Sequence, residues 1–250
     1  MKKALFALLF ISLAVGIFAV PVKDFLIFNN FNNSFKIAKA LDKGLIIVFS
    51  SPTCYYCEML KNDVFSDEKI SNLLTNNFIV AEMYADPKLN GNFDTNIGKF
   101  SDDSEQFTYD ELFAIFGVRG TPHTAFFSRT LEYAGSIPGM IPSEIFGGLI
   151  KYISQELYSN DIEFDKYDSV SDKFEGFKTI KSITEEQQSL ITHYLPEMIT
   201  EYDFESFKNE NLTMLDPYKY YIISGTTLDN LKTYISKLDK SLLYNLYVIE

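Results

Sequence analysis

The pattern of apolar and polar positions in the first part of the chain predicts a helix, a buried strand and a second helix. Ser34 precedes an amphipathic stretch, and Gly44 follows it as a glycine that ends the helix. Residues 45–49, LIIVF, are a continuous apolar run rich in β-branched side chains, which is typical of a strand buried on both faces. Residues 50–53, SSPT, end the strand, and a helical pattern follows through Leu60.

Strand and helix patterns alternate again farther along the chain. The apolar spacing of residues 70–74 predicts a helix, and residues 78–84, FIVAEMY, predict a strand. Residues 86–106 are polar and rich in Asn, Asp and Gly, so we expect an excursion between elements there.

In the next segment, a capping box marks the start of a helix and a proline marks the start of a strand. Thr108 and Glu111 have the spacing of a capping box, which opens a helix that ends at Gly117. The apolar residues 123–127 predict the next strand. This strand begins directly after Pro122, and a proline at the entry of a strand is unusual.

The last predicted helix of this part of the chain begins at Ser143. Its apolar residues recur at helical spacing as far as Leu157. Residues 159–172, SNDIEFDKYDSVSD, contain five acidic residues and one lysine, which favours a linker.

Residues 173–250 predict a separate small α+β domain. Two βαβ-like units can be traced in it, and a ferredoxin-like arrangement is one candidate. We find no nucleophile constellation, ligand cluster or phosphate loop there, so docking, dimerisation and scaffolding all stay open as roles. The expected strands are 177–183, 198–207, 220–223 and 243–249, with helices from Thr184 to Pro196 and over 228–238.

The first twenty residues have the layout of a secretory signal. Lys2 and Lys3 precede an apolar run from Ala4 to Val20, and cleavage after Ala19 is compatible with the sequence. The run also reaches the lower end of the ~17–25 residues that span a bilayer, so an uncleaved membrane anchor is the alternative. Either way we expect an exported protein with a periplasmic or other extracytoplasmic location.

Composition sets the class of protein. The 250 residues are 46% hydrophobic, which allows a substantial core and excludes global disorder. The formal net charge is −12, and we find no clusters of Lys and Arg that could hold phosphates, so nucleic acid is excluded as a partner. The length fits one large domain or two small ones.

The chain has two cysteines: Cys54 lies at the predicted strand-to-helix junction, and Cys57 lies one turn deeper in the predicted helix, within reach of a disulfide. Export would place them in an oxidising compartment, where thiols form disulfides. A disulfide between them would close only two intervening residues and remove little entropy from the unfolded chain, so a chemical role is favoured over a structural one. Unpaired backbone N–H groups at the start of the helix would lower the pKa of Cys54.

A metal site is the competing interpretation of the two thiols. A closed zinc site needs four ligands, and the only histidines are His123 and His193. His123 directly follows Pro122, so a three-ligand site is conceivable, whereas His193 has no other chemical groups near it in the sequence.

Three segments together carry a resemblance to a known family. They are SSPTCYYCEML at 50–60, GVRGTPHTAFF at 117–127 and SIPGMIPSEIFGGLI at 136–150. In this order they resemble the thioredoxin superfamily, and most of all exported thioredoxin-like proteins related to the catalytic domain of the bacterial disulfide isomerase. The resemblance covers residues 34–157.

The resemblance implies a fold and a set of site residues. The fold would be an α/β thioredoxin fold, a central mixed sheet flanked by helices, over residues 21–158. Cys54 would be the exposed attacking cysteine and Cys57 the resolving one. Pro122 would be a cis-proline whose loop faces the disulfide, and Thr121 before it would help to bind the substrate chain.

The sequence departs from the family in two places. Thioredoxin has a buried acid six residues before its first cysteine, and here that position is Val48. Glu58 follows on the predicted helix, but we interpret it as a solvated surface charge. Tyr55 and Tyr56 match neither reducing thioredoxins nor strong oxidants, so the direction of electron flow stays open. The two tyrosines are candidates for substrate contact and equally for simple packing.

The sequence thus predicts an exported thiol–disulfide oxidoreductase that acts on protein substrates with thiols or disulfides. Its mechanism needs no cofactor and no metal, but the reduced form requires an electron source, which we expect to be a membrane-bound redox partner. Two alternatives stay open. One is a binding or chaperone-like module that uses the fold as an interaction surface, and the other is a CxxC metal-binding protein.

Overall fold

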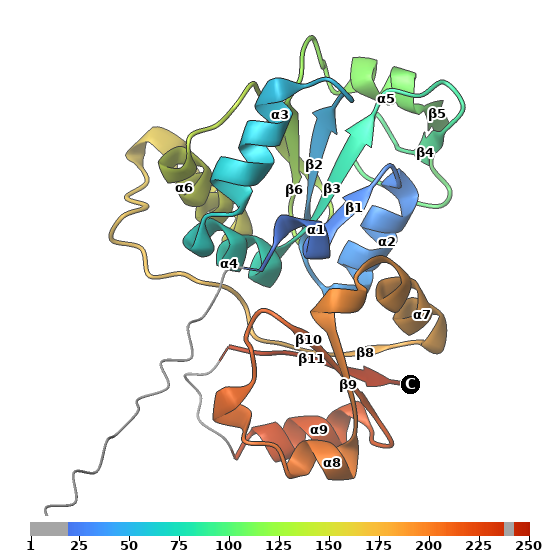
Figure 1. Ribbon diagram of the computed structural model, residues 1–250, viewed down its shortest axis with the longest axis vertical. Coiled ribbons are helices and arrows are strands. Elements are labelled where there is room, and N and C mark those ends of the chain that lie inside the picture. Colours follow the sequence, from blue (N-terminus) through green and yellow to red (C-terminus); the bar gives the residue numbers. More distant parts are fainter. Residues whose placement is uncertain (1–19, 238–242) are drawn as a thin grey trace, which may run out of the picture.

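Two main β-sheets with their helices make up most of the described part of the chain (Figure 1). The computed structural model describes residues 20–237 and 243–250. The first sheet has five strands in the order β1-β3-β2-β6-β7, and the second has four in the order β8-β11-β10-β9. A small two-stranded sheet, β4-β5, completes the first unit.

The first unit contains the mixed sheet and the helices that cover it. Figure 1 shows α3 and α6 on one side of the sheet and α2 on the other. Its strands are β1 Leu26–Phe28, β2 Gly44–Ser50, β3 Phe78–Tyr84, β4 Asn90–Asn92, β5 Gln106–Thr108, β6 His123–Phe127 and β7 Tyr133–Pro138. Its helices are α1 Val22–Phe25, α2 Phe31–Leu41, α3 Tyr55–Met59, the π-helix η1 Leu60–Phe65, α4 Glu68–Asn77, α5 Tyr109–Ile115 and α6 Ser143–Ser154.

Strand β2 is the centre of this sheet, and each of its seven residues is buried. It runs parallel to β3 on one side and antiparallel to β6 on the other. A continuous apolar strand suits this position because helices cover both faces of the sheet. The predicted mixed central sheet flanked by helices is therefore confirmed.

Helix α2 begins one turn earlier than the sequence suggested. The side chain of Asn30 caps it by accepting a hydrogen bond from the backbone N–H of Asn33. Ser34, which we expected just before the helix, is buried inside it, and its hydroxyl donates to the Asn30 carbonyl at 2.6 Å. The helix ends at Asp42 in a left-handed conformation, and Gly44 already belongs to β2.

The second unit is an α/β layer rather than the expected α+β domain. Each of the first three strands is followed by a helix, and every strand pairing is parallel. The ferredoxin-like candidate is wrong, because that arrangement joins two strands directly. The elements are β8 Thr179–Ile183, α7 Glu185–Tyr194, β9 Ile199–Asp203, α8 Phe204–Lys208, β10 Tyr220–Ser224, α9 Leu228–Ile235 and β11 Asn245–Ile249. Short 3₁₀ turns lie among them at Pro196–Met198 and Leu212–Met214, and two more, Leu157–Asn160 and Phe164–Lys166, lie between α6 and β8.

Asp203 is the residue that turns the expected strand 198–207 into a strand and a helix. Its carboxylate accepts a hydrogen bond from the backbone N–H of Ser206, which caps α8. The chain therefore leaves the sheet after Asp203, and Phe207 is buried on the helix instead of in the strand. The alternation of aromatic and acidic residues that suggested a longer strand continues across this boundary.

One hydrophobic core joins the two units. It contains residues of the first sheet together with Ile183, Ile222 and Tyr247 of the second. Buried hydroxyls add hydrogen bonds across the same boundary. Tyr247 donates to the Leu41 carbonyl at 2.8 Å, and Tyr220 donates to the Thr75 carbonyl at 3.1 Å. The other face of the second sheet packs on α8 and α9 in a separate cluster of buried side chains: Phe207, Tyr221, Ile223, Leu231, Ile235, Leu246 and Val248.

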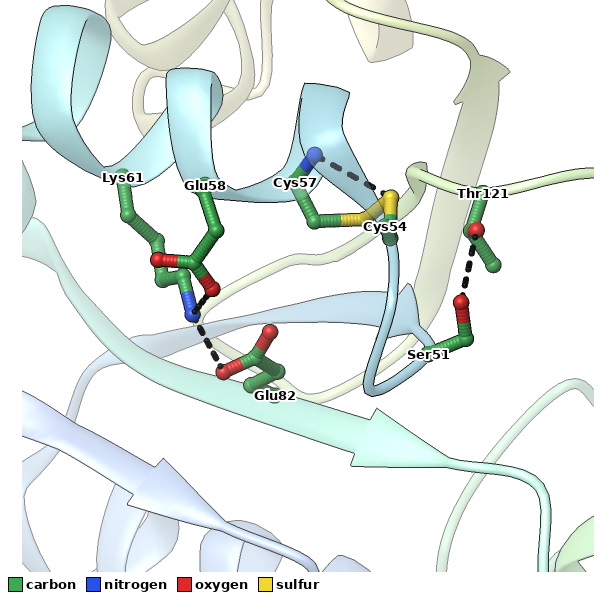
Figure 2. The surroundings of a disulfide bond; sticks show 7 residues. All are labelled: Ser51, Cys54, Cys57, Glu58, Lys61, Glu82 and Thr121. Atoms are coloured by element: carbon green, nitrogen blue, oxygen red, sulfur yellow. Dashed lines mark hydrogen bonds and ion pairs between the residues drawn. A yellow bond between two sulfur atoms is a disulfide. The ribbon is translucent and has the colours of Figure 1, made fainter.

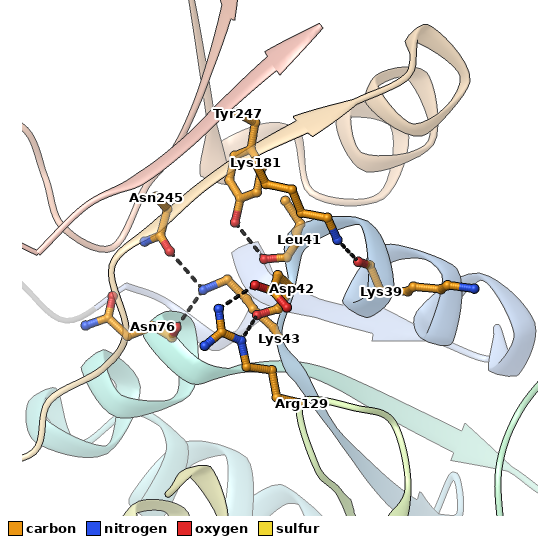
Figure 3. A network of polar contacts seen from close by, with 9 residues as sticks. All are labelled: Lys39, Leu41, Asp42, Lys43, Asn76, Arg129, Lys181, Asn245 and Tyr247. Carbon is orange, nitrogen blue, oxygen red and sulfur yellow. Dashed lines mark hydrogen bonds and ion pairs between the residues drawn. The ribbon is translucent and has the colours of Figure 1, made fainter. Parts of the chain in front are cut away.

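A buried lysine lies at the boundary between the units (Figure 3). Lys43, 1% exposed, donates to the Asn76 carbonyl at 2.6 Å and to Asn245 Oδ1 at 3.1 Å. Beside it, Arg129 pairs with Asp42. Burial of Lys43, with help from the positive charge of Arg129, lowers the pKa of its ammonium group to about 7.

The expected signal peptide or anchor, residues 1–20, falls almost wholly outside the described residues. Among residues 20–237 and 243–250, no helix has the length and apolar character needed to cross a membrane.

Candidate active site

Cys54 and Cys57 form a disulfide at the start of α3 (Figure 2). Their Cα atoms are 5.2 Å apart. Cys54 is the N-cap residue of the helix, and its Sγ accepts a hydrogen bond from the backbone N–H of Cys57 at 3.1 Å. The same N–H also donates to the Cys54 carbonyl at 3.2 Å, so the loop that follows β2 places one sulfur at the first backbone N–H groups of the helix.

The two sulfurs differ in their access to solvent. Cys54 is partly exposed, whereas Cys57 is 1% exposed and lies on the buried face of α3. Tyr55 and Tyr56 between them are 70% and 58% exposed, and their rings meet edge to face with centroids 5.6 Å apart. Neither tyrosine packs in the core, so an aromatic surface lies directly beside the partly exposed sulfur.

The Thr121–Pro122 segment lies beside the disulfide. Its peptide bond is cis. The hydroxyl of Thr121 is 3.5 Å from that of Ser51 in the loop that leads to Cys54, and Figure 2 shows Thr121 beside Cys54. The buried Pro122 accepts a hydrogen bond from Gly139 N–H at 2.8 Å. The structure thus brings together the residues that the resemblance assigned to the site, while their roles in binding substrate stay predictions.

The two histidines lie in different units. His123 is buried on β6, its ring 6.2 Å from that of Phe49, and burial lowers the pKa of its imidazole. His193 is on α7 and contacts Tyr194, with ring centroids 4.8 Å apart. Within the described part of the chain, no group of three or more His, Cys, Asp or Glu side chains is placed to hold a metal ion.

Sequence reasoning missed a buried charge pair under the active-site helix. Glu82 on β3 is 3% exposed, and its Oε2 accepts a hydrogen bond from Lys61 Nζ at 3.1 Å. The exposed Glu58 pairs with the same ammonium at 2.7 Å, as Figure 2 shows. The available signal was the single acid in the apolar run FIVAEMY, which has no reason to be there in a strand buried on both faces.

The positive charge of Lys61 is stabilised by the two neighbouring carboxylates. Burial by itself would lower its pKa, but hydrogen bonds to Glu58 and Glu82 and their negative charges outweigh burial and raise the pKa above its ordinary value. Lys61 therefore stays protonated at neutral pH.

We expect the two thiols of the reduced protein to react at different rates. Cys54 should be alkylated by iodoacetamide several-fold faster than Cys57, because it is more exposed and its thiolate is stabilised by the Cys57 N–H group. Mass mapping of a time course after reduction measures both rates. Faster labelling of Cys57 would overturn the assigned order of attack.

Comparison with known proteins identifies one domain in the chain. Residues 31–154 match the family model of the thioredoxin-like domain. Among solved structures, a thioredoxin from Thermus thermophilus is 20% identical, with a TM-score of 0.41, over 58% of this chain and 98% of that one. A thioredoxin-fold protein from Helicobacter pylori is 17% identical, with a TM-score of 0.40, over 72% of this chain and 97% of that one. A comparison with curated proteins gives no significant match.

Proposed function

Because its domain at residues 31–154 makes this chain a member of the thioredoxin superfamily, we propose that it exchanges disulfides with exported protein substrates. Thiol–disulfide oxidoreductase activity itself follows from the domain match and the Cys54–Cys57 pair. The single observation that carries the proposal is the position of Cys54, partly exposed and held as the N-cap of α3 with its sulfur on the Cys57 N–H. A sulfur in this place is a good leaving group and, when reduced, a stabilised thiolate.

The reaction has two steps, and in each step a thiolate breaks one disulfide bond and forms another. In the reducing direction, the Cys54 thiolate attacks a substrate disulfide, forms a mixed disulfide and releases one substrate thiolate. The Cys57 thiolate then attacks Cys54 Sγ, which closes the Cys54–Cys57 disulfide and releases the second substrate thiolate. Two electrons pass from the protein dithiol to the substrate, and the same steps in reverse donate a disulfide.

Protein chains are the substrate class that the surface of the site favours. Tyr55 and Tyr56 present two exposed aromatic rings next to Cys54. The Thr121–Pro122 segment lies beside the disulfide. Together they offer apolar area and backbone groups on an open surface, which suits an extended peptide segment next to its own cysteine.

Export is supported by the N-terminal sequence. Two lysines and an apolar run to Val20 have the composition of a secretory signal or an anchor. In an oxidising compartment the protein would need a continuing supply of electrons to act as a reductant, and a membrane-bound dithiol partner would provide it. If the protein instead donates its disulfide to substrates, it would need an oxidising partner that forms the Cys54–Cys57 disulfide again.

Two assays with one variant test the proposal. The protein should accelerate either the reduction of insulin by dithiothreitol or the oxidative refolding of a reduced disulfide protein, and Cys54→Ser should abolish that activity because the attacking thiol is gone. If neither reaction is accelerated and Cys54→Ser changes nothing, the enzyme assignment fails and a binding module is favoured.

A further inference from the structure

An exposed phenylalanine lies at the same edge of the first sheet as the disulfide. Phe28 is the last residue of β1, and it is 50% exposed. Strands β1, β3 and β2 are parallel neighbours, so their carboxyl ends meet at one edge of the sheet. Cys54 follows the carboxyl end of β2 at this edge, and Phe28 lies two strands away.

Phe28 also points to the face of the sheet that α3 covers. In the register of the sheet it lies opposite Glu82, and residues opposite one another on neighbouring strands point to the same face. The Glu82 carboxylate binds Lys61 Nζ at 3.1 Å, and Lys61 belongs to η1, the helical segment that continues α3. Phe28 therefore shares both the edge and the face of the sheet with the active-site helix.

Aromatic side chains lead from the disulfide to Phe28. The rings of Phe28 and Tyr84 meet edge to face, with centroids 4.8 Å apart. Burial raises the pKa of the Tyr84 phenol, and the charges of Glu82 and Glu58 raise it further, so the phenol lies within electrostatic range of both carboxylates. On α3, Tyr55 lies three residues before Glu58 and so on the same side of the helix. We call Tyr55, Tyr84 and Phe28 the aromatic strip.

The residue after β1 holds Phe28 in a fixed position. Asn29 has a left-handed backbone conformation, with φ 46°. Its backbone N–H donates to the Glu82 carbonyl at 2.9 Å, and its side-chain oxygen accepts a hydrogen bond from the Tyr84 N–H at 2.7 Å. These bonds tie the end of β1 to β3. A molecule that binds the Phe28 ring therefore has little backbone freedom left to remove.

We propose that the aromatic strip binds an apolar side chain of the substrate, within the same chain segment as the cysteine that bonds to Cys54. The proposal rests on the disulfide exchange proposed above. The occupant is the substrate itself because the strip begins at Tyr55, the residue next to Cys54. Neighbouring strands are about 4.8 Å apart and an extended chain rises about 3.3 Å per residue, so the bound side chain would stand roughly three to five residues from the reacting cysteine.

Such a subsite selects substrates that are not yet folded. Large apolar side chains are mostly buried in a folded protein, so they cannot reach the strip. An unfolded segment can lay its cysteine on the disulfide and an apolar side chain on the strip at the same time. Glutathione is too short to do this and has no large apolar side chain, so it serves as the reference for disulfide exchange without the subsite.

Symmetric peptide disulfides test the subsite. Each consists of two copies of a short peptide of serine and glycine joined through its single cysteine, with either phenylalanine or serine about four residues away on both sides. The rate at which the reduced protein reduces each peptide is divided by the rate with dithiothreitol. We expect the phenylalanine peptide to react about three to ten times faster than the serine peptide, because two aromatic rings in contact attract one another. In Phe28→Ser the two peptides should react at equal rates.

Ile97→Ser is the matched control. Ile97 is 61% exposed, so the variant also removes a large exposed apolar side chain. The next residue, Gly98, accepts a hydrogen bond from the Tyr133 N–H at 3.1 Å. Tyr133 pairs with Phe127, which lies opposite the amino end of β2 and therefore at the far edge of the sheet from the disulfide. Ile97→Ser should keep the full preference for the phenylalanine peptide.

Three outcomes would overturn the proposal. These are equal rates for the two peptides with the unmodified protein, an undiminished preference in Phe28→Ser, or an equal loss of preference in Ile97→Ser. An undiminished preference together with the loss of a dimer in Phe28→Ser would assign the ring to contact between two copies of the chain instead. If Phe28→Ser does not fold, Phe28→Lys is measured in its place, because lysine suits an edge strand. If the unmodified protein reduces neither peptide nor oxidised glutathione, the proposed function fails and the subsite fails with it.

Discussion

Replacing Cys57 with serine is expected to make the protein accumulate mixed disulfides through Cys54, while replacing Cys54 with serine will give none. Without the resolving thiol, the intramolecular attack that normally releases the substrate cannot occur. Without the attacking thiol, no adduct forms at all. The burial of Cys57 increases the expected difference between the two variants, because a cysteine that is 1% exposed is poorly placed to capture substrates itself.

Acid quenching of cells that produce each variant, followed by non-reducing gels, measures this effect. Most of the Cys57→Ser protein should migrate in adducts that collapse on reduction, and the trapped partners should be exported proteins that contain cysteines. The double variant Cys54→Ser/Cys57→Ser is the control for disulfides that form nonspecifically. Identical adduct patterns in the two single variants would contradict the two-step mechanism, and partners drawn from the cytoplasm would contradict export.

The second large effect is expected from Lys43. Its pKa is about 7 in the folded protein, whereas a lysine in an unfolded chain has a pKa of about 10.5. Between these two values the unfolded state binds more protons, so the free energy of unfolding rises with pH. This one group should make the protein more stable at pH 9.5 than at pH 7 by about 3 kcal/mol, and Lys43→Met should remove that slope.

Urea unfolding at a series of pH values measures the slope, and the difference between the variant and the unmodified protein isolates Lys43 from other titrating groups. Lys39→Met is the matched control, because Lys39 is an exposed lysine in the preceding helix. It should retain the pH dependence. An unchanged slope in Lys43→Met would show that the lysine is charged throughout and held by its two acceptors, Asn76 and Asn245.

Local signals made the first unit predictable. The apolar run 45–49, the polar break after it and the Thr108 capping box each depend on neighbours in the sequence, and the structure places β2, α3 and α5 there. The two cysteines and Pro122 lie at element boundaries that the same signals mark. The mixed sheet and the thioredoxin-like domain were therefore correctly predicted from the sequence.

Features that depend on pairing between distant strands were not predictable in this way. The position of Glu82 under the active-site helix depends on the register between β3 and β2, which pairs it with Val48, and on the π-helix that carries Lys61. Nothing in the residues adjacent to Glu82 in the sequence specifies that register. Val48, where thioredoxin has an acid, lies opposite Glu82 in the register of the sheet.

The second unit shows the same limitation. Alternating strands and helices were found, but the sequence does not state which strands are neighbours or whether they run parallel. The α+β prediction failed for this reason, together with the helix that Asp203 begins. The buried Lys43 was also missed, since its acceptors Asn76 and Asn245 come from two different units.

The order of strands in the second sheet has a consequence for the time course of synthesis. Strand β8 is the first of its four strands to be made, yet it joins the sheet only through β11, which is made after all the others. Until β11 emerges, β8 has no neighbour and β10 lacks one of its two. A nascent chain that stops before Asn245 therefore leaves the buried side of this layer open, including the surface that receives Tyr247.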